Sequence, residues 1–168
     1  MLIMMAGLPA SGKSVIAQEL APLLSGIILD KDKIRAALFP PWEIEYSTEQ
    51  NDFCMDIALQ VADYILSRNP EKIIVLDGRP FSKRYQRARV IELARRLQTP
   101  LKIIECVCAD ETARERLARA DHVAANRDWE LYRSIKASFE PIQEPRLVVN
   151  TDNDLETCVQ QSLEYIRA

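Results

Sequence analysis

The octet Gly7-Leu8-Pro9-Ala10-Ser11-Gly12-Lys13-Ser14 decides the fold of this chain. It matches the pattern G-x-x-x-x-G-K-[S/T] at every fixed position, and it stands between an apolar run and a stretch with helical periodicity. Its two glycines let the backbone turn tightly, so that successive N–H groups point inward at phosphate oxygens. The helix that follows adds the positive end of its dipole. The octet therefore predicts a phosphate-binding loop, with Lys13 on the outer phosphates of a nucleoside triphosphate and Ser14 on Mg²⁺.

The composition is that of an acidic globular chain. Its 168 residues are 48% hydrophobic and 28% charged, with a formal net charge of −3, which favours one domain around one core. The negative charge does not favour nucleic acid or an anionic membrane as a partner of the whole chain. Only six residues precede Gly7, so we expect no signal peptide and no membrane span there. The four cysteines lack a metal-binding spacing, and we expect reduced thiols in a cytoplasmic protein.

Short apolar runs alternate with longer helical patterns along the whole chain. Runs without polar alternation suit parallel strands that are covered on both faces, and strand–helix alternation implies right-handed crossovers. We therefore predict an α/β fold, a three-layer α/β/α sandwich with a five-stranded parallel sheet. The expected strands are 2–6, 27–29, 73–76, 101–107 and 147–149. The expected helices are 13–24, 47–67, 82–97, 110–120, 126–138 and 154–166.

The carboxyl ends of the predicted strands carry polar residues that converge on one edge of the sheet, where ligands bind in this class of fold. After the second strand, Asp32 and Arg35 are three residues apart and share a face if a helix begins near Asp32. Asp32 can accept a proton from a substrate hydroxyl, and Arg35 can hold the substrate. The alternative is an N-capping aspartate with a solvated arginine. Asp30 is the weaker candidate, because it can simply cap the turn.

The third apolar run ends in Asp77, in the form of a Walker B strand. Such an aspartate can hold Mg²⁺ or orient Ser14, and the alternative is an acidic strand cap. Arg79 follows two residues later and is a further candidate for contact with the substrate.

Arginines follow the fourth strand and predict a lid over the triphosphate, at about residues 110–130, that neutralises charge during transfer. Arg114, Arg116 and Arg119 cannot all share one helix face, and we favour Arg116 and Arg119 as the functional pair. Arg127 lies just beyond.

Residues 79–96 hold seven cationic residues and a single acid, Glu92. A solvated basic helix face is the favoured interpretation, and a groove for a polyanion is the alternative. Trp42, after two prolines, can stack on a substrate or seal the edge of the core, and the sequence does not separate these roles.

Together these motifs make the chain resemble the small P-loop kinases that include zeta toxins, chloramphenicol phosphotransferase, gluconate kinase and the 5′-kinase domain of polynucleotide kinases. The resemblance spans nearly the whole chain, and it implies a fold like that of nucleoside monophosphate kinases, as one domain over residues 1–168 with a helical lid. It also implies that Asp32 is the general base, that Arg35 binds the acceptor and that the lid arginines engage the donor phosphates. The chain departs from the group at Asp77-Gly78-Arg79-Pro80, where these kinases often carry Asp-Ala-Thr.

The leading functional hypothesis is an ATP- and Mg²⁺-dependent kinase that phosphorylates a hydroxyl of a small molecule. One alternative is a polynucleotide 5′-hydroxyl kinase, which the basic run 79–96 motivates. Another is a nucleotide-binding regulatory ATPase without an acceptor, against which the Asp32–Arg35 pair argues. The guanine-reading motif N-K-x-D is absent from the sequence, so ATP is the expected nucleotide.

Overall fold

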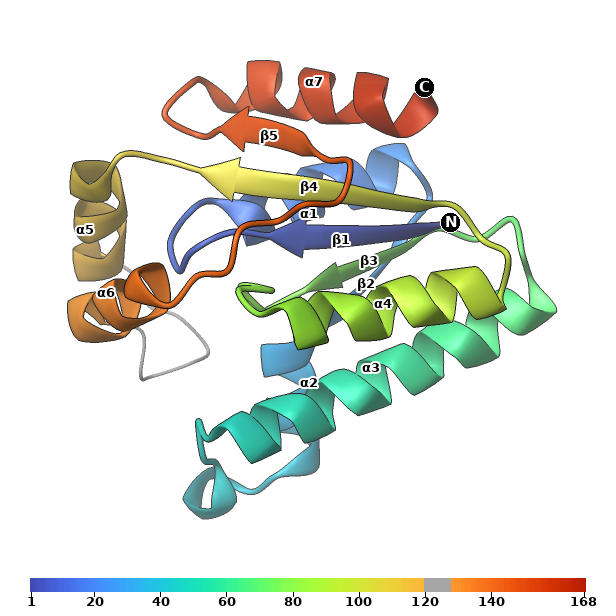
Figure 1. Ribbon diagram of the computed structural model, residues 1–168, viewed down its shortest axis with the longest axis horizontal. Coiled ribbons are helices and arrows are strands. Elements are labelled where there is room, and N and C mark those ends of the chain that lie inside the picture. The colour runs from blue at the N-terminus through green and yellow to red at the C-terminus, as the bar shows by residue number, and fades with distance from the viewer. Residues whose placement is uncertain (120–127) are drawn as a thin grey trace.

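A single parallel sheet forms the centre of the molecule (Figure 1). The computed structural model describes residues 1–119 and 128–168. Its five strands lie in the order β2-β3-β1-β4-β5, and every neighbouring pair is parallel. The strands are β1 (Leu2–Ala6), β2 (Ile27–Asp30), β3 (Ile74–Asp77), β4 (Leu101–Val107) and β5 (Leu147–Asn150). The predicted five-stranded parallel sheet is confirmed, with ends that differ by one residue at most.

The six predicted helices are present among the described residues, and a further helix begins at Lys31, close to Asp32. The helices are α1 (Lys13–Leu23), α2 (Lys31–Leu38), α3 (Thr48–Arg68), α4 (Arg84–Arg96), α5 (Asp110–Arg119), α6 (Trp129–Ala137) and α7 (Leu155–Arg167), with a 3-10 turn η1 (Pro41–Glu43). Side-chain caps set several starts: Asp30 caps α2, Ser47 caps α3, Asp128 caps α6 and Asp154 caps α7. The predicted helix at 126–138 begins at Trp129 among the described residues. Residues 120–127, which include part of the expected lid and Arg127, lie outside them.

Two apolar layers enclose the sheet because successive residues of β1 point to opposite faces. Leu2 and Met4 pack with residues of α3 and α4, while Ile3 and Met5 pack with residues of α1 and α7. All five residues of β1 are buried, as expected for a central strand covered on both faces. The three-layer sandwich is therefore confirmed (Figure 1).

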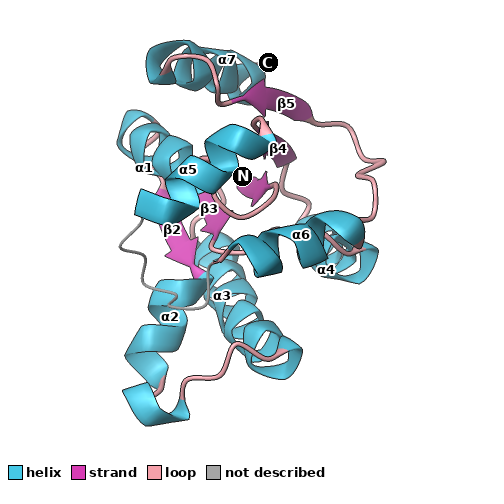
Figure 2. Ribbon diagram, turned by 90° about the vertical axis from the view of Figure 1, so that its left-hand side faces the viewer, coloured by secondary structure: helices cyan, strands magenta, loops and turns pink. Residues whose placement is uncertain are grey.

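All five strands end on the same side of the molecule. Figure 2 looks onto that side and shows α5 and α6 in front of the sheet, with α2 and the start of α3 below it. The loop after β1 opens there, as do the ends of β2 and β3. This edge therefore gathers the polar residues predicted from the strand ends. Within the described residues, no helix is both long and apolar enough to cross a membrane.

Candidate functional site

The loop Gly7–Ser14 joins β1 to α1 in a conformation that depends on its glycines. Gly7 has φ 130° and Gly12 has φ 84°, values that L side chains rarely adopt. Gly7 also packs against β4: a Cβ built on it would lie 2.2 Å from the carbonyl oxygen of Cys106. Its N–H donates to the carbonyl of Pro80, 3.0 Å away, which ties the loop to the chain that follows β3. Both positions therefore require glycine because of their backbone torsion, and Gly7 also has no room for a side chain.

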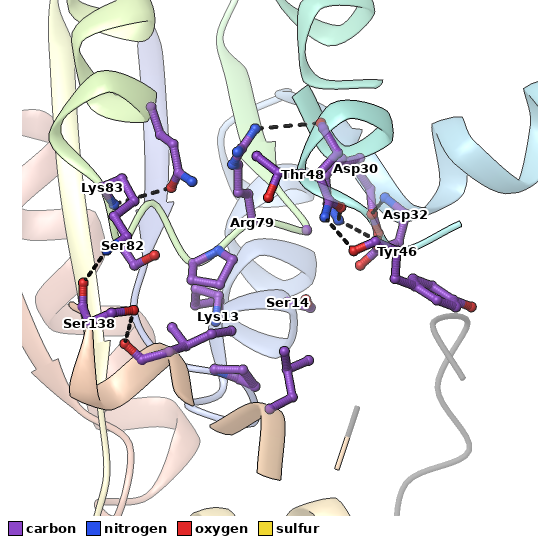
Figure 3. Close-up of a pocket in the computed structure, with 18 of the residues that line it drawn as sticks. Lys13, Ser14, Asp30, Asp32, Tyr46, Thr48, Arg79, Ser82, Lys83 and Ser138 are labelled. Carbon is purple, nitrogen blue, oxygen red and sulfur yellow. Dashed lines mark hydrogen bonds and ion pairs between the residues drawn. The ribbon is translucent and has the colours of Figure 1, made fainter. Parts of the chain in front are cut away.

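Lys13 and Ser14 begin α1 and face a cavity of about 530 Å³ (Figure 3). Lys13 is buried, and its ammonium group donates to the carbonyl of Leu8 at 2.6 Å and to the hydroxyl of Ser11 at 3.3 Å. The lysine is thereby folded back over the loop whose N–H groups would receive a phosphate. The cavity is also lined by residues of β2, α2, α3, α4 and α6. It therefore extends from the phosphate-binding loop as far as α6.

Asp32 lies in the wall of this cavity, in the first turn of α2. Its Oδ1 atom is 2.7 Å from the ammonium group of Lys31 and 2.7 Å from Nη1 of Arg35. Both cations are almost fully buried. Asp32 does not cap the helix, because the N–H groups of residues 32 and 33 donate to the side chain of Asp30. Two cations on one carboxylate oxygen fix its orientation and leave Oδ2 as the atom for other chemistry.

Arg35 lies behind Asp32 rather than in the cavity wall. Only 2% of the residue is exposed; its Nη2 donates to the side-chain oxygen of Asn51, and its guanidinium lies 5.1 Å from the ring centroid of Tyr46. The sequence predicts this arginine on the substrate, whereas the structure surrounds it with protein groups because α3 packs directly against α2. Its position suits an arginine that holds Asp32 in place.

Asn51 connects the groups around Asp32. Its side-chain oxygen accepts hydrogen bonds from Arg35 and from Lys31, the latter at 2.7 Å, and its amide group donates to the carbonyl of Tyr46. The burial of Lys31 lowers the pKa of its ammonium group, and the charge of Asp32 opposes that shift. Sequence reasoning missed both Lys31 and Asn51. A lysine directly before Asp32 was visible in the sequence, but no local pattern joins residue 51 to residue 35.

Arg79 lines the cavity, and its predicted contact with a substrate stays a prediction. It is 4% exposed, and its Nη2 lies 2.5 Å from the carboxylate of Asp52 and 3.3 Å from the hydroxyl of Tyr85. The loop before α4 supplies the arginine and α3 supplies the aspartate.

Asp77 and Asp30 lie side by side at the ends of neighbouring strands, as partners in the register of β3 and β2. Burial raises the pKa of Asp30, and the charge of Asp77 raises it further, against two backbone hydrogen bonds that lower it. Asp77 is 2% exposed, and its Oδ1 atom has no hydrogen-bond partner among the described residues. A buried carboxylate oxygen without a partner is costly unless a ligand satisfies it.

The chemistry of the available oxygen groups fits a divalent cation. Mg²⁺ prefers oxygen ligands and is usually held by one or two protein groups, waters and substrate phosphates. The hydroxyl of Ser14 and the unsatisfied carboxylate of Asp77 are protein groups of that kind. No cluster of three or more metal-binding side chains occurs in residues 1–119 and 128–168.

Of the two favoured lid arginines, the structure brings only Arg116 to the phosphate-binding loop. It donates to the carbonyl of Ala10 at 3.2 Å and to the hydroxyl and carbonyl of Thr151 at 2.9 and 2.7 Å. The Thr151 hydroxyl in turn donates to the carbonyl of Ser11. Arg119 points elsewhere: its side chain is 80% exposed and pairs with Glu115. Residues three apart lie on the same side of a helix, so the sequence does not distinguish the two arginines. In the structure only Arg116 contacts the phosphate-binding loop, whereas Arg119 pairs with Glu115 of its own helix.

The basic run 79–96 forms a ladder of ion pairs with α3 rather than an open cationic groove. Arg79, Arg89 and Arg96 pair with Asp52, Asp56 and Asp63, which lie along α3. Arg87 is buried, donates to the carbonyls of Phe81 and Pro141 and lies near Glu144, while Lys83 and Arg95 also contact acids. These ion pairs leave few unpaired cations to bind a polyanion, so the structure does not support a polyanion groove. Most cations of residues 79–96 instead hold α4 and its preceding loop against neighbouring segments.

The remaining candidates lie outside the site. All four cysteines are free, and three of them are buried, as predicted for reduced thiols. Burial raises the pKa of Cys106 to about 12, so its thiol is protonated at neutral pH. Trp42 is 81% exposed in η1 and does not seal the core.

Comparisons with known proteins agree with this fold. A protein-family model described as AAA domain matches residues 2–142. A solved structure from Chloroflexus aurantiacus J-10-fl has 21% identity and a TM-score of 0.75, covering 98% of this chain and 97% of its own. The Mycobacterium tuberculosis APS kinase CysC, in complex with AMPPNP and APS, has 16% identity and a TM-score of 0.74 over 99% and 97% of the two chains. A gluconokinase from Sinorhizobium meliloti 1021 has 17% identity and a TM-score of 0.68 over 98% and 90%. No curated protein matches the sequence.

Proposed function

The chain belongs to the AAA domain family, and on this premise we propose that it is an ATP-dependent kinase that phosphorylates a hydroxyl group of a small molecule. One observation carries the proposal: Lys13 and Ser14 of the phosphate-binding loop share one cavity with the buried, doubly paired carboxylate of Asp32. A donor site and a proton acceptor in one cavity are what phosphoryl transfer to a hydroxyl requires. The similar structures include an APS kinase in complex with APS and a gluconokinase. This similarity supports the proposal of a small-molecule kinase.

In this mechanism Asp32 accepts the proton of the acceptor hydroxyl on Oδ2, while Lys31 and Arg35 hold Oδ1. The acceptor oxygen forms a bond to the γ-phosphorus as the bond from that phosphorus to the β–γ bridging oxygen breaks, and ADP leaves. Lys13 and the N–H groups of the loop bind the phosphates. Mg²⁺, when bound, neutralises charge on the phosphates, and Ser14 and Asp77 are the residues that would hold it. Arg116 fixes the loop from the side of α5.

We further propose that residues 1–168 act as one kinase domain. The free cysteines fit a reducing compartment such as the cytoplasm. A polynucleotide acceptor has little support, because most cations of the basic run already pair with acids of α3 and its neighbours.

The test is incubation of the protein with ATP, Mg²⁺ and a library of hydroxyl-bearing metabolites, followed by mass spectrometry. We expect at least one product that carries an added phosphoryl group. Asp32→Asn should lower turnover by about 10²- to 10⁴-fold, the range for loss of a general base, with ATP affinity retained. Lys13→Met should instead weaken ATP binding. Hydrolysis of ATP without any phosphorylated acceptor would identify a regulatory ATPase, and transfer to 5′-hydroxyl oligonucleotides alone would identify a polynucleotide kinase.

A further inference from the structure

Within residues 1–119 and 128–168, the acceptor side of the cavity carries equal numbers of positive and negative side chains. Besides Lys13, which belongs to the phosphate-binding loop, three cations line the cavity among the described residues: Lys31, Arg79 and Lys83. Three acids line it as well: Asp30, Asp32 and Glu140. Among the described residues, the charge of this side is therefore balanced before any ligand binds.

Two of these cations are buried and already paired with a carboxylate. Lys31 is 2.7 Å from Asp32, and Arg79 is 2.5 Å from Asp52. An anionic group on the acceptor would have to displace a carboxylate from its buried cation or share that cation with it. Either choice leaves negative charge without full compensation inside the protein, which is unfavourable.

The third cation is also engaged. The ammonium group of Lys83 donates to the carbonyl of Ser138 at 2.6 Å and lies 3.9 Å from the carboxylate of Glu140. Figure 3 shows Lys83 and Ser138 joined on the side of the cavity opposite Asp32. This contact ties the start of α4 to the end of α6, and the acid beside it would repel a second anion.

Apolar side chains form one part of the remaining wall. Leu131 and Ile135 lie one turn apart on α6 and both line the cavity, together with Pro9 and Pro80. Leu131 and Ile135 are only partly buried by the protein itself, so a ligand in the cavity can cover them. Removing such surface from water favours binding of an apolar group.

We propose that the acceptor is an uncharged alcohol with an apolar or aromatic portion, and that the ion pair between Asp52 and Arg79 keeps anionic acceptors out. This inference rests on the proposed kinase function and specifies its substrate class. The hydroxyl lies at Asp32, and the apolar portion lies against Leu131 and Ile135. Asp52 is a specificity-determining residue that acts through Arg79.

The first test compares matched acceptors with the wild-type protein, ATP and Mg²⁺. The set contains a neutral alcohol, its anionic counterpart and a neutral alcohol without the apolar group: phenyl glucoside, phenyl glucuronide and methyl glucoside. We expect the protein to phosphorylate the neutral alcohol that carries the apolar group. The kcat/KM for its anionic counterpart should be at least tenfold lower. Better use of the anionic members overturns the inference and leaves the kinase proposal intact. Transfer to none of these acceptors, while the metabolite library yields a phosphorylated anion, overturns the inference alone; no product from either experiment, with ATP bound, overturns both.

The second test releases Arg79 from its carboxylate. Asp52→Asn keeps the shape of the side chain and removes the charge, so kcat/KM for anionic counterparts should rise by about tenfold, as expected when an arginine gains an anionic partner. Asp56→Asn is the matched control, because Asp56 lies one turn away on α3 and pairs with Arg89 outside the cavity. It should leave the ratio of anionic to neutral acceptor use unchanged. If both variants fold by thermal melting and show the same ratio as the wild type, Asp52 does not set charge selectivity and the inference fails.

Discussion

Arg35 reaches back one helical turn to Asp32 and binds its Oδ1 atom at 2.7 Å, with 2% of the arginine exposed to solvent. The arginine is enclosed by α2 and α3, and its contacts to Asn51 and Tyr46 hold it there. Asp32 is therefore held from inside the protein, while the cavity lies on its other side. The contribution of Arg35 to holding Asp32 in place can be measured.

Arg35→Met removes one partner of a buried ion pair, and we expect the free energy of unfolding to fall by about 3 kcal/mol, since Lys31 compensates the aspartate in part. Chemical denaturation provides the measurement. Arg119→Met is the control, because the exposed pair of Arg119 with Glu115 should contribute less than about 1 kcal/mol. Equal stabilities of the two variants would contradict the supporting role of Arg35.

The adjacent carboxylates of Asp30 and Asp77 predict a stability that depends on pH. Burial and the charge of Asp77 raise the pKa of Asp30 in the folded protein, so folding favours its protonated form. Protonated Asp30 contributes to the free energy of unfolding in full below the pKa that it has in the unfolded chain. This contribution is lost as the pH rises through the pKa of Asp30 in the folded protein. Asp30→Asn keeps a capping oxygen, and it should stabilise the protein at about pH 7 more than at about pH 3.

Asp154→Asn is the matched control, since Asp154 also caps a helix but has a pKa that hydrogen bonds from Thr157 lower. Its contribution is present above the unfolded pKa and is lost as the pH falls. That variant should therefore destabilise the protein at about pH 7 and have less effect in acid. Melting curves at both pH values separate the two cases, and a loss of stability at neutral pH in both variants would refute the prediction for Asp30.

Arg116 should matter for nucleotide binding and Arg119 should not. Arg116 binds the carbonyl of Ala10 and both oxygens of Thr151, so Arg116→Ala should loosen the loop and raise the Kd for ATP by about tenfold, the effect of losing charged hydrogen bonds. Arg119→Ala should change the Kd less than about twofold. Isothermal titration calorimetry with a non-hydrolysable ATP analogue measures both. A larger effect for Arg119 would restore it as the lid residue.

Gly7 should tolerate no side chain. A Cβ at this position would lie 2.2 Å from the carbonyl oxygen of Cys106, and the backbone has φ 130°. Gly7→Ala should lower the free energy of unfolding by about 3 kcal/mol or more and abolish ATP binding. Gly26→Ala is the comparison, because the nearest atom to its added Cβ is 3.5 Å away. A Gly7→Ala protein that binds ATP normally would show that the loop can adopt another path.

The order of strands and helices was predictable because it depends on local pattern. The apolar runs without polar alternation identified buried parallel strands, and the octet Gly7–Ser14 fixed the junction of β1 and α1. The location of Asp32 and Asp77 at one edge of the sheet was also predictable, since the carboxyl ends of parallel strands meet there.

The partners of the charged side chains could not be predicted in the same way. Asn51 reaches Arg35 across 16 residues, Arg79 pairs with Asp52 across 27, and Arg116 binds Thr151 across 35. Arg116 and Arg119 are equivalent in the local pattern, and only the packing of α5 beside the loop distinguishes them.

The sequence by itself thus determined the loop Gly7–Ser14, the layered sheet and the strand ends at which the candidate site lies. Backbone torsion and hydrophobic periodicity act over a few residues, so both are visible in a single stretch of chain. The tertiary structure alone decided which cations support Asp32, which of them are occupied by acids and where apolar surface faces the cavity. Those properties depend on distances between side chains far apart in the sequence, and such distances exist only after the helices have packed.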